Sequence, residues 1–416
     1  MSSAFLFHRS LRLTDNLGLL EALNQSQSVL PIFCVDPRQA SSRGNKFFSP
    51  FSLSFMLQSL TDLQEELRKH GSELLLLEGE PHRVLPPLLV EAGVTTLYMN
   101  NDYTPFARKR KVEIEKALRG DVCVVEVDDY LLFPPGSIST CSGTAYRVFT
   151  PFLNASKREN VDKSKSLENA ERLMKKTQFK SSLSEIGWDC LQQNSKLSPC
   201  GLRGGRSEGV RILSEVQKTQ RYYSERRDYL SYTTSQLSPY IKFGCISIRE
   251  AWEGLGKAPN TASMALRRQL MWREFYYHYY IAYPAELEWE KKVEETKLSD
   301  GAPDIVKACL QELDITGCLH NRGRMIVANY LLHNQGEYWK AGDVTFATRL
   351  IDYDPFVNIG NWRWIDKQPK FRWLKPDVQY QRWDKDYPKS EEMKGKGSYT
   401  KFWLQPRVKI EQELTS

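Results

Sequence analysis

Five short apolar runs, each separated from the next by a segment with helical periodicity, fill the first 130 residues. They are residues 4–7 (AFLF), 28–35 (SVLPIFCV), 73–77 (ELLLL), 96–99 (TLYM) and 122–127 (VCVVEV). Runs of this length suit buried strands, and stretches such as residues 17–24 suit amphipathic helices. Strands that alternate with helices build a parallel sheet covered on both faces. We therefore expect an α/β doubly wound domain over residues 1–130.

The loop after the first run carries no GxGxxG motif, since the sequence there reads HRSLRLTDN. A Rossmann-type dinucleotide site needs those glycines between the first strand and the next helix. The α/β half therefore indicates no ligand by itself.

A chain of 416 residues is long enough to divide into two domains. Residues 157–209 turn rich in Ser, Lys, Glu and Asn and end in the glycine-rich LRGGRSEG, which is typical of an exposed connector. After it, apolar residues recur at helical spacing, as in LRRQLMWREFYYHYYIAYP. We expect residues 131–210 to connect the α/β domain to an all-α domain over residues 211–416.

The net charge of +7 favours a polyanionic partner only weakly. The distribution says more, because residues 362–383 (WRWIDKQPKFRWLKPDVQYQRW) interleave cations with aromatic rings. Cations neutralise phosphates and rings stack on exposed bases, so this zone suits a nucleic acid. A buried aromatic cluster with a charged rim explains the same composition equally well.

Other features exclude whole classes of protein. The 8 cysteines include no CxxC pair, so we expect no metal site and no disulfide framework. No apolar run approaches the length of a membrane span, and the N-terminal run has basic residues after it rather than before it. We expect an intracellular monomer that contacts no membrane. No targeting signal in the sequence decides between the cytoplasm and the nucleus.

The segment IDYDPFVNIGNWRWI concentrates two aspartates, an asparagine and two tryptophans. Pro355 suits the first turn of a helix, so Asp354 is expected to cap a helix that begins there. Asn358 and Trp362 would then follow at one-turn intervals. Such an arrangement sets an amide and an indole on one face.

Three neighbouring segments place polar groups at helical spacing. One face of LRRQLMWREFYYH carries Gln269, Trp272, Arg273 and Tyr276, which suits a planar polar ligand, although a core tryptophan beside a surface arginine fits as well. The hydroxyls of TTSQLSPY, residues 233–240, suit either a phosphate at a helix start or an ordinary cap. Asn321, Arg324 and Met325 align in HNRGRMI, and a buried Arg324 would need a carboxylate from the aspartate-rich segment.

Together these motifs resemble the photolyase and cryptochrome flavoproteins. The resemblance rests on FLFHRSLRLTDN, NDYTPFARKR, TSQLSPYIKFG, MWREFYYH, TGCLHNRGRMI, LIDYDPFVNIGNWRW and LKPDVQYQRWD, whose order and spacing match over nearly the whole chain. Within the family the chain is most similar to class I deoxyribodipyrimidine photolyases. The resemblance implies that light-excited reduced FAD gives an electron to a flipped-out cyclobutane pyrimidine dimer in UV-damaged DNA, and the dimer splits.

The resemblance assigns one group of residues to FAD. Contacts to its phosphates and ribitol are implied for Tyr222, Thr234, Ser235, Gln236, Leu237 and Ser238. Arg324 and Asp352 match an ion pair beside the isoalloxazine ring, and Asp354 and Arg273 are assigned to the cofactor as well. Asn358 matches the residue facing flavin N5, where a neutral amide bonds the ring nitrogen but does not readily deliver a proton. Related plant photoreceptors carry an aspartate there, so Asn358 favours repair.

The resemblance also implies an electron path and a lesion site. Trp362 and Trp339 match the inner members of a tryptophan chain that re-reduces oxidised flavin, and Trp289 is the candidate for the third. Lesion or DNA contacts are implied for Gln269, Trp272, Asn321, Arg322, Met325, Trp364 and Gln379. Trp272 and Trp364 match the two indoles that sandwich the dimer. Asn358, Gln269 and the three tryptophans of the chain form the expected catalytic set.

Some positions depart from the family pattern and leave alternatives open. Gln269 stands where cyclobutane-specific relatives usually carry a glutamate, so a cryptochrome-type blue-light receptor remains an alternative. Photolyases for (6-4) photoproducts, a further alternative, place two histidines where this chain has Asn321 and Met325. Phe106 and Ala107 stand where some relatives carry polar ligands for a folate antenna. The identity of a second, antenna chromophore therefore stays open, and it could be a deazaflavin, a flavin or absent. A silent flavoprotein that binds single strands would also fit the basic aromatic zone.

Overall fold

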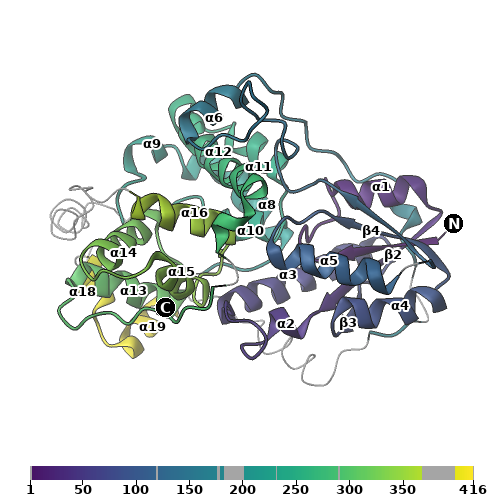
Figure 1. The fold of residues 1–416 in the computed structure, drawn as a ribbon, viewed down its shortest axis with the longest axis horizontal. Helices are drawn as coiled ribbons and strands as arrows, with labels where there is room; N and C mark the ends of the chain where they lie inside the picture. Colours follow the sequence, from purple (N-terminus) through teal and green to yellow (C-terminus); the bar gives the residue numbers. More distant parts are fainter. Residues whose placement is uncertain are drawn as a thin grey trace.

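The computed structural model describes residues 2–118, 120–175, 179–181, 201–230, 232–288, 291–367 and 399–415. Its first half is built on a parallel five-stranded sheet of order β3-β2-β1-β4-β5 (Figure 1). The strands are β1 (Ser2–Phe7), β2 (Ser28–Val35), β3 (Leu75–Glu78), β4 (Val94–Asn100) and β5 (Cys123–Val127). Each coincides closely with an apolar run of the sequence, so the predicted doubly wound sheet is confirmed.

Helices cover both faces of this sheet. They are α1 (Leu17–Gln25), α2 (Pro37–Ala40), α3 (Pro50–Lys69), α4 (Pro81–Glu91) and α5 (Pro105–Ala117). Successive side chains of a strand point to opposite faces. Phe5 and Phe7 of β1 are buried in one apolar cluster with side chains of α1 and α3, whereas Ala4 and Leu6 are buried in another with side chains of α4 and α5. The alternation within β1 thus builds two cores.

The second half is helical, as predicted. Its elements are α8 (Arg206–Thr219), α9 (Tyr223–Arg226), α10 (Ser238–Lys242), α11 (Ile248–Leu255), α12 (Asn260–Ala282), η2 (Pro284–Leu287), α13 (Asp304–Thr316), α14 (Asn321–His333), α15 (Trp339–Ala347), α16 (Pro355–Asp366), α18 (Tyr399–Trp403) and α19 (Arg407–Thr415). Within the described ranges, no helix combines the length and the apolar character needed to cross a bilayer.

The predicted connector, residues 131–210, contains ordered elements in its described part. Helix α6 (Phe149–Ser156) packs against α12, and a 3-10 turn, η1 (Ala170–Arg172), follows. Leu173 then forms a parallel bridge with Val29 of β2, which returns the chain to the sheet. The connector therefore contributes to both halves, and the predicted domain boundaries remain a prediction.

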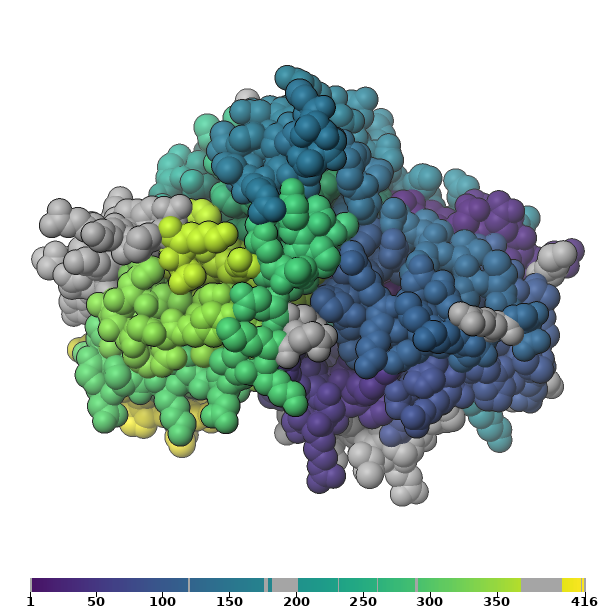
Figure 2. Space-filling model, viewed as in Figure 1, coloured from purple at the N-terminus to yellow at the C-terminus, as the bar shows by residue number. Residues whose placement is uncertain are grey.

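A buried ion-pair network joins the two halves. Arg249 on α11 binds the carboxylates of Asp15, at 2.9 Å, and Asp129, at 2.7 Å, and Arg12 binds the same Asp129 at 2.7 Å. All four side chains are nearly inaccessible to water. Losing one partner of such a network would leave an uncompensated buried charge, so it fixes the two halves relative to each other. Figure 2 shows the helical half (green) meeting the α/β half (blue) along a broad seam.

Candidate functional site

A cavity of about 570 Å³ lies in the helical half, walled by α10, α12, α14 and α16 and by the loops that lead into α10 and α16. This volume falls in the range of small-molecule and cofactor sites. Most of the residues singled out from the sequence line it. They are Thr234, Ser235, Gln236, Leu237, Ser238, Gln269, Trp272, Arg273, Asn321, Arg322, Arg324, Met325, Asp352, Asp354, Asn358, Trp362 and Trp364.

Of the predicted residues that the structure describes, Trp339 and Tyr222 do not line the cavity. Trp289 and Gln379 fall outside the described residues. Trp339 is buried at the start of α15 and is not part of the cavity wall. Tyr222 is 43% exposed, with its ring against Arg226, whereas Tyr223 is buried and lines the cavity. Of these two neighbouring tyrosines at the start of the short α9, Tyr223 is the one that lines the cavity, and the cofactor contact inferred for Tyr222 stays a prediction.

The hydroxyl-rich segment enters α10 through a backbone turn. Gln236 has φ 52°, in the left-handed region, and Ser238 is the first helical residue. The cap position, Leu237, has no side-chain acceptor, so the alternative of an ordinary N-cap does not hold for α10. Ser238 instead donates a hydrogen bond from Oγ to Oδ2 of Asp352 over 2.6 Å. This bond ties the segment to the aspartate-rich loop.

Arg324 and Asp352 form the ion pair expected from the sequence. Nη2 of Arg324 lies 3.0 Å from both carboxylate oxygens, and Nε donates to the carbonyl of Leu319 over 2.9 Å. Burial alone would raise the pKa of Asp352, but the Arg324 charge and the Ser238 hydrogen bond hold it below its usual value. Asp352 is therefore an ionised acceptor beside a fixed donor at the cavity wall.

Helix α16 begins at Pro355, as predicted. Asp354 caps it, with Oδ1 accepting from the backbone N–H groups of Phe356, at 3.1 Å, and Val357, at 3.2 Å. Its other oxygen, Oδ2, accepts a hydrogen bond from the phenol of Tyr277. This cap fixes the first turn and sets Asn358 and Trp362 on the face that lines the cavity.

The side chain of Asn358 is hydrogen-bonded to a carboxylate that the sequence analysis did not identify. Its Nδ2 donates to Oδ1 of Asp343 over 2.8 Å. Asp343 lies on α15, is fully buried, and pairs with the fully buried Lys340 at 3.0 Å. Tyr353 donates to the same carboxylate over 3.2 Å. No local pattern in KAGDVTFA marks Asp343 as functional, since its partners come from other elements.

The two inner tryptophans of the predicted chain lie on packed helices. Trp362 on α16 is 2% exposed, and its ring lies against Gly342 of α15, where a Cβ atom would come within 2.2 Å of Cη2. Glycine is therefore needed at that point. Trp339 begins the same α15, three residues before Gly342, and is 4% exposed. Both rings are shielded from water.

The outer part of the cavity carries the predicted lesion residues. Trp272 stacks on Phe149 of α6 with ring centroids 3.6 Å apart, and it meets Trp364 edge-on at 6.5 Å. Arg322 pairs with Asp228, and its Nη1 also lies 3.4 Å from the sulfur of Met325. Phe149 was missed because it falls in the segment expected to be a connector, yet it supports one face of the Trp272 indole.

Another cavity residue missed from the sequence is Lys242, the last residue of α10. Its ammonium donates to Oγ of Ser52 over 2.7 Å and faces the cavity from the side of the α/β half. Burial, reinforced by the nearby charge of Arg9, lowers the pKa of Lys242 to about 7. Its helix is too short for periodicity to have indicated that this side chain faces the cavity.

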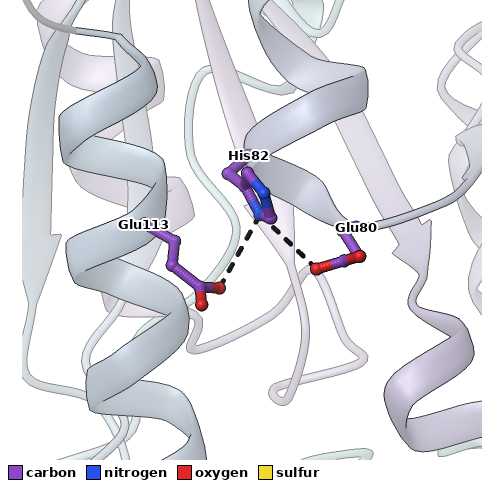
Figure 3. Close-up of side chains that lie close together, drawn as sticks. All are labelled: Glu80, His82 and Glu113. Atoms are coloured by element: carbon purple, nitrogen blue, oxygen red, sulfur yellow. Dashed lines mark ion pairs between the residues drawn. The ribbon is translucent and has the colours of Figure 1, made fainter. Parts of the chain in front are cut away.

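A separate polar cluster lies in the α/β half, where Glu80, His82 and Glu113 bring their ligand-type atoms within 4.8 Å of one another (Figure 3). His82 Nδ1 lies 3.8 Å from Glu80 and 3.7 Å from Glu113. The guanidinium of Arg38 reaches the same carboxylates at 3.1 Å and 2.8 Å. Because Arg38 already supplies the balancing positive charge, we interpret the cluster as an ion-pair network rather than a metal centre.

Comparison with known proteins agrees with this architecture. Residues 3–170 match the family described as DNA photolyase, and residues 266–403 match the FAD binding domain of DNA photolyase. A deoxyribodipyrimidine photo-lyase of Synechococcus is 29% identical and covers 100% of this chain and 92% of its own length. One from Halobacterium salinarum is 30% identical, covering 92% of this chain and 86% of its own.

A solved structure adds to the likeness. The archaeal photolyase from Sulfolobus tokodaii, described with two FAD molecules, superposes with a TM-score of 0.77 at 31% identity, covering 99% of this chain and 93% of that one. The helical half of the present chain is accordingly an FAD-binding domain. Sequence identity, coverage and fold agree, and the chain belongs to the photolyase and cryptochrome family.

Proposed function

We propose that this chain is a deoxyribodipyrimidine photo-lyase, which uses light to split cyclobutane pyrimidine dimers in DNA. The observation that carries the proposal is that one cavity is lined both by the residues proposed for FAD and by those proposed for the lesion. Direct electron transfer weakens steeply with distance, so a flavin and a pyrimidine dimer must share one site. A cavity with both sets of residues meets that requirement.

The donors and acceptors of the cavity fit FAD. The Arg324 guanidinium and the ionised Asp352 lie side by side, which suits the mixed donor and acceptor edge of an isoalloxazine ring. Hydroxyls of Thr234, Ser235 and Ser238 suit the phosphates and the sugar chain. When bound, FAD supplies the absorption of blue light and the one-electron chemistry. The residues of the chain bind and orient it.

Asn358 has a defined part in this proposal. Because its Nδ2 donates to Asp343, its Oδ1 is the amide atom left to face the cavity. An amide oxygen accepts a hydrogen bond and carries no proton to give away. Asn358 therefore favours a flavin that bears a proton at the contacting nitrogen, which is the reduced form that repair requires.

The outer residues are proposed to hold a flipped dimer. Trp272 and Trp364 offer aromatic faces, and Asn321 and Met325 offer an amide and an adaptable thioether at the opening. Arg322 is proposed to meet DNA phosphate, which requires it to exchange its pairing with Asp228. Because phosphate contacts release counterions, binding should weaken steeply with salt.

A second candidate is a blue-light receptor of the cryptochrome kind, which Gln269 favours. Gln269 lies at the rim with its Nε2 3.4 Å from the carbonyl of Ala265, and an amide cannot donate a proton to a dimer radical. The two candidates differ in one measurable respect. A receptor binds FAD and responds to light without removing dimers, whereas a lyase removes them.

Illumination of the reduced holoprotein with an oligonucleotide that contains one thymine dimer separates the candidates. We expect the dimer to be lost under blue light and to remain in the dark. Chromatography of the digested strand measures the loss. Binding that leaves the dimer intact under light would reject repair. A protein that prefers undamaged single strands would point instead to a silent binding protein.

A further inference from the structure

Tyr338 occupies the position from which an electron could reach the buried tryptophans. It is the residue before α15, half-exposed, and its ring centroid lies 5.4 Å from that of Trp339 at an angle of 56°. Trp339 itself is 4% exposed. An oxidised Trp339 would therefore be shielded from reductants in solution, and Tyr338 provides an adjacent ring that water reaches.

The phenol of Tyr338 has a proton acceptor in place. It donates a hydrogen bond to Oε2 of Glu288, which follows η2 and has φ 48°, in the left-handed region that few side chains adopt. Lys291 completes the group, with Nζ 3.7 Å from the Glu288 carboxylate and 4.0 Å from the centre of the Tyr338 ring. Burial, with the Glu288 hydrogen bond, raises the pKa of Tyr338, so the phenol keeps its proton in the resting protein.

Lys291 determines how this ring could be oxidised. A cation over the face of an aromatic ring is attracted by the electron-rich face and opposes a positive charge on it. Removing only an electron from Tyr338 would create such a charge directly below Lys291. Moving the phenolic proton to Glu288 at the same time leaves a neutral ring and a protonated acid. Electron loss and proton loss are thus expected to occur together.

We propose that Tyr338 is the outermost electron donor of a chain that runs from Trp362 through Trp339 to Tyr338, with Glu288 as the acceptor of the phenolic proton. This inference rests on the proposed role of Trp362 and Trp339 in re-reducing the flavin. It is independent of Trp289, whose position lies outside the described residues.

The electrons and protons of this step balance between side chains of the protein and one external reductant. Oxidised Trp339 takes one electron from Tyr338 and returns to the neutral indole, while the O–H bond of Tyr338 breaks and its proton forms a new O–H bond with Oε2 of Glu288. A neutral phenoxyl radical remains on Tyr338. A small-molecule thiol then returns a hydrogen atom to the phenoxyl oxygen and becomes a thiyl radical, and Glu288 releases its proton to water.

Electron paramagnetic resonance on the holoprotein, illuminated with oxidised flavin and without added thiol, tests the inference. Protein that carries ring-deuterated tyrosine should give a narrower radical signal than unlabelled protein, since the electron spin then resides on tyrosine. Tyr338→Phe should remove this difference and shorten the lifetime of the separated charges by roughly tenfold or more, as the remaining tryptophan radical recombines with the flavin. Glu288→Gln keeps a hydrogen-bond acceptor but not a base, and should do the same.

Two variants control for structural effects. Tyr283→Phe removes another half-exposed tyrosine, whose ring centre also lies close to a cation, 3.9 Å from the guanidinium carbon of Arg147. The Tyr283 hydroxyl donates to the carbonyl of Ala145 rather than to a carboxylate. The variant should behave as the unaltered protein does. Dimer repair by chemically reduced Tyr338→Phe should also be unchanged, because repair does not use the outward path.

The outcomes separate this inference from the function on which it rests. A tyrosine-derived signal that survives in Tyr338→Phe, or a lifetime that is lost in Trp289→Phe and kept in Tyr338→Phe, would overturn the role of Tyr338 while leaving the inner tryptophans in place. Photoreduction that persists in Trp362→Phe would overturn the inner path itself, and the inference with it.

Discussion

The side-chain amide of Asn358 donates its hydrogen bond to Asp343 rather than to the cavity, over 2.8 Å, and Asp343 is in turn paired with Lys340 where both side chains are fully buried. Burial raises the pKa of Asp343 above its usual value, and the Lys340 charge and three hydrogen bonds offset only part of that rise. The orientation of the amide at the cavity therefore depends on a buried ion pair one helix away.

Asp343→Asn tests this dependence through stability. The substitution keeps the size of the side chain but leaves the buried ammonium of Lys340 without its carboxylate, which should cost about 3 to 5 kcal/mol. Chemical denaturation measures the loss. Asp314→Asn is a matched control, because Asp314 pairs with Arg349 at the surface, where its side chain is 48% exposed, and such pairs contribute about 1 kcal/mol or less. Equal costs for the two variants would contradict the pairing.

His320 gives stability a defined dependence on pH. It caps α14 through Nδ1, which accepts from the backbone N–H of Arg322 over 3.0 Å. Burial, with the charges of Arg322 and Arg324, lowers the pKa of His320 from 6.5 to about 4. Between these values the unfolded chain binds a proton that the folded protein does not, so stability falls as the pH drops through this window. The loss from pH 7 to pH 5 should be about 2 kcal/mol.

His320→Asn keeps an N-cap acceptor and removes the titrating group, so the variant should lack this part of the pH dependence. Denaturation curves at several pH values measure it. The exposed His70 at the end of α3 provides a second histidine-to-asparagine variant, outside this cap, for comparison. A slope that does not differ between the two variants would show that His320 titrates normally in the folded state.

The sequence predicted the parts of this molecule that depend on local physics. The five strands were found because each is an apolar run bounded by helical segments, and the cap at Asp354 was found because proline favours the first turn. Asp343 was not found, because its role comes from the packing of α15 on α16, which Gly342 permits. Phe149 was not found, because a polar connector gave no reason to expect a ring stacked on Trp272.

The choice between two adjacent tyrosines shows the same limit. Tyr222 and Tyr223 stand side by side, and α9, which begins at the second, is only four residues long. Such a helix shows no periodicity that would tell which ring faces inward. The motif resemblance indicated Tyr222, and the structure shows that its neighbour Tyr223 is the one that lines the cavity.

Trp362→Phe should separate photoreduction from repair. Phenylalanine fills most of the buried space beside Gly342 but is far harder to oxidise than an indole, so light should no longer reduce oxidised flavin. Repair should persist once the flavin is reduced chemically. Absorption spectra under illumination and a repair assay measure the two activities. Trp252→Phe, on α11 against Arg267 and away from the cavity wall, is the matched control and should affect neither. Loss of both activities together in Trp362→Phe would contradict an electron-transfer role.

Gln269→Glu should increase repair for each photon absorbed. A protonated carboxyl at the rim can give a proton to the dimer radical, which the present amide cannot. We expect an increase of about twofold to tenfold, below the roughly hundredfold or more that a fully positioned general acid contributes, because residue 269 is exposed at the rim. Comparing initial rates at equal light absorption measures it. Gln311→Glu, on α13 and not among the residues that line the cavity, is a suitable control. A decrease in Gln269→Glu would indicate that the amide itself is the productive contact.

Light-driven removal of a thymine dimer is the most direct measure of the central claim. Reduced holoprotein is mixed with an oligonucleotide that carries one dimer, and strands are assayed after blue light and after darkness. The account predicts restored thymines only in the illuminated sample, with a yield that falls as salt weakens binding. A protein that holds FAD, binds the damaged strand and leaves every dimer in place under light would contradict it.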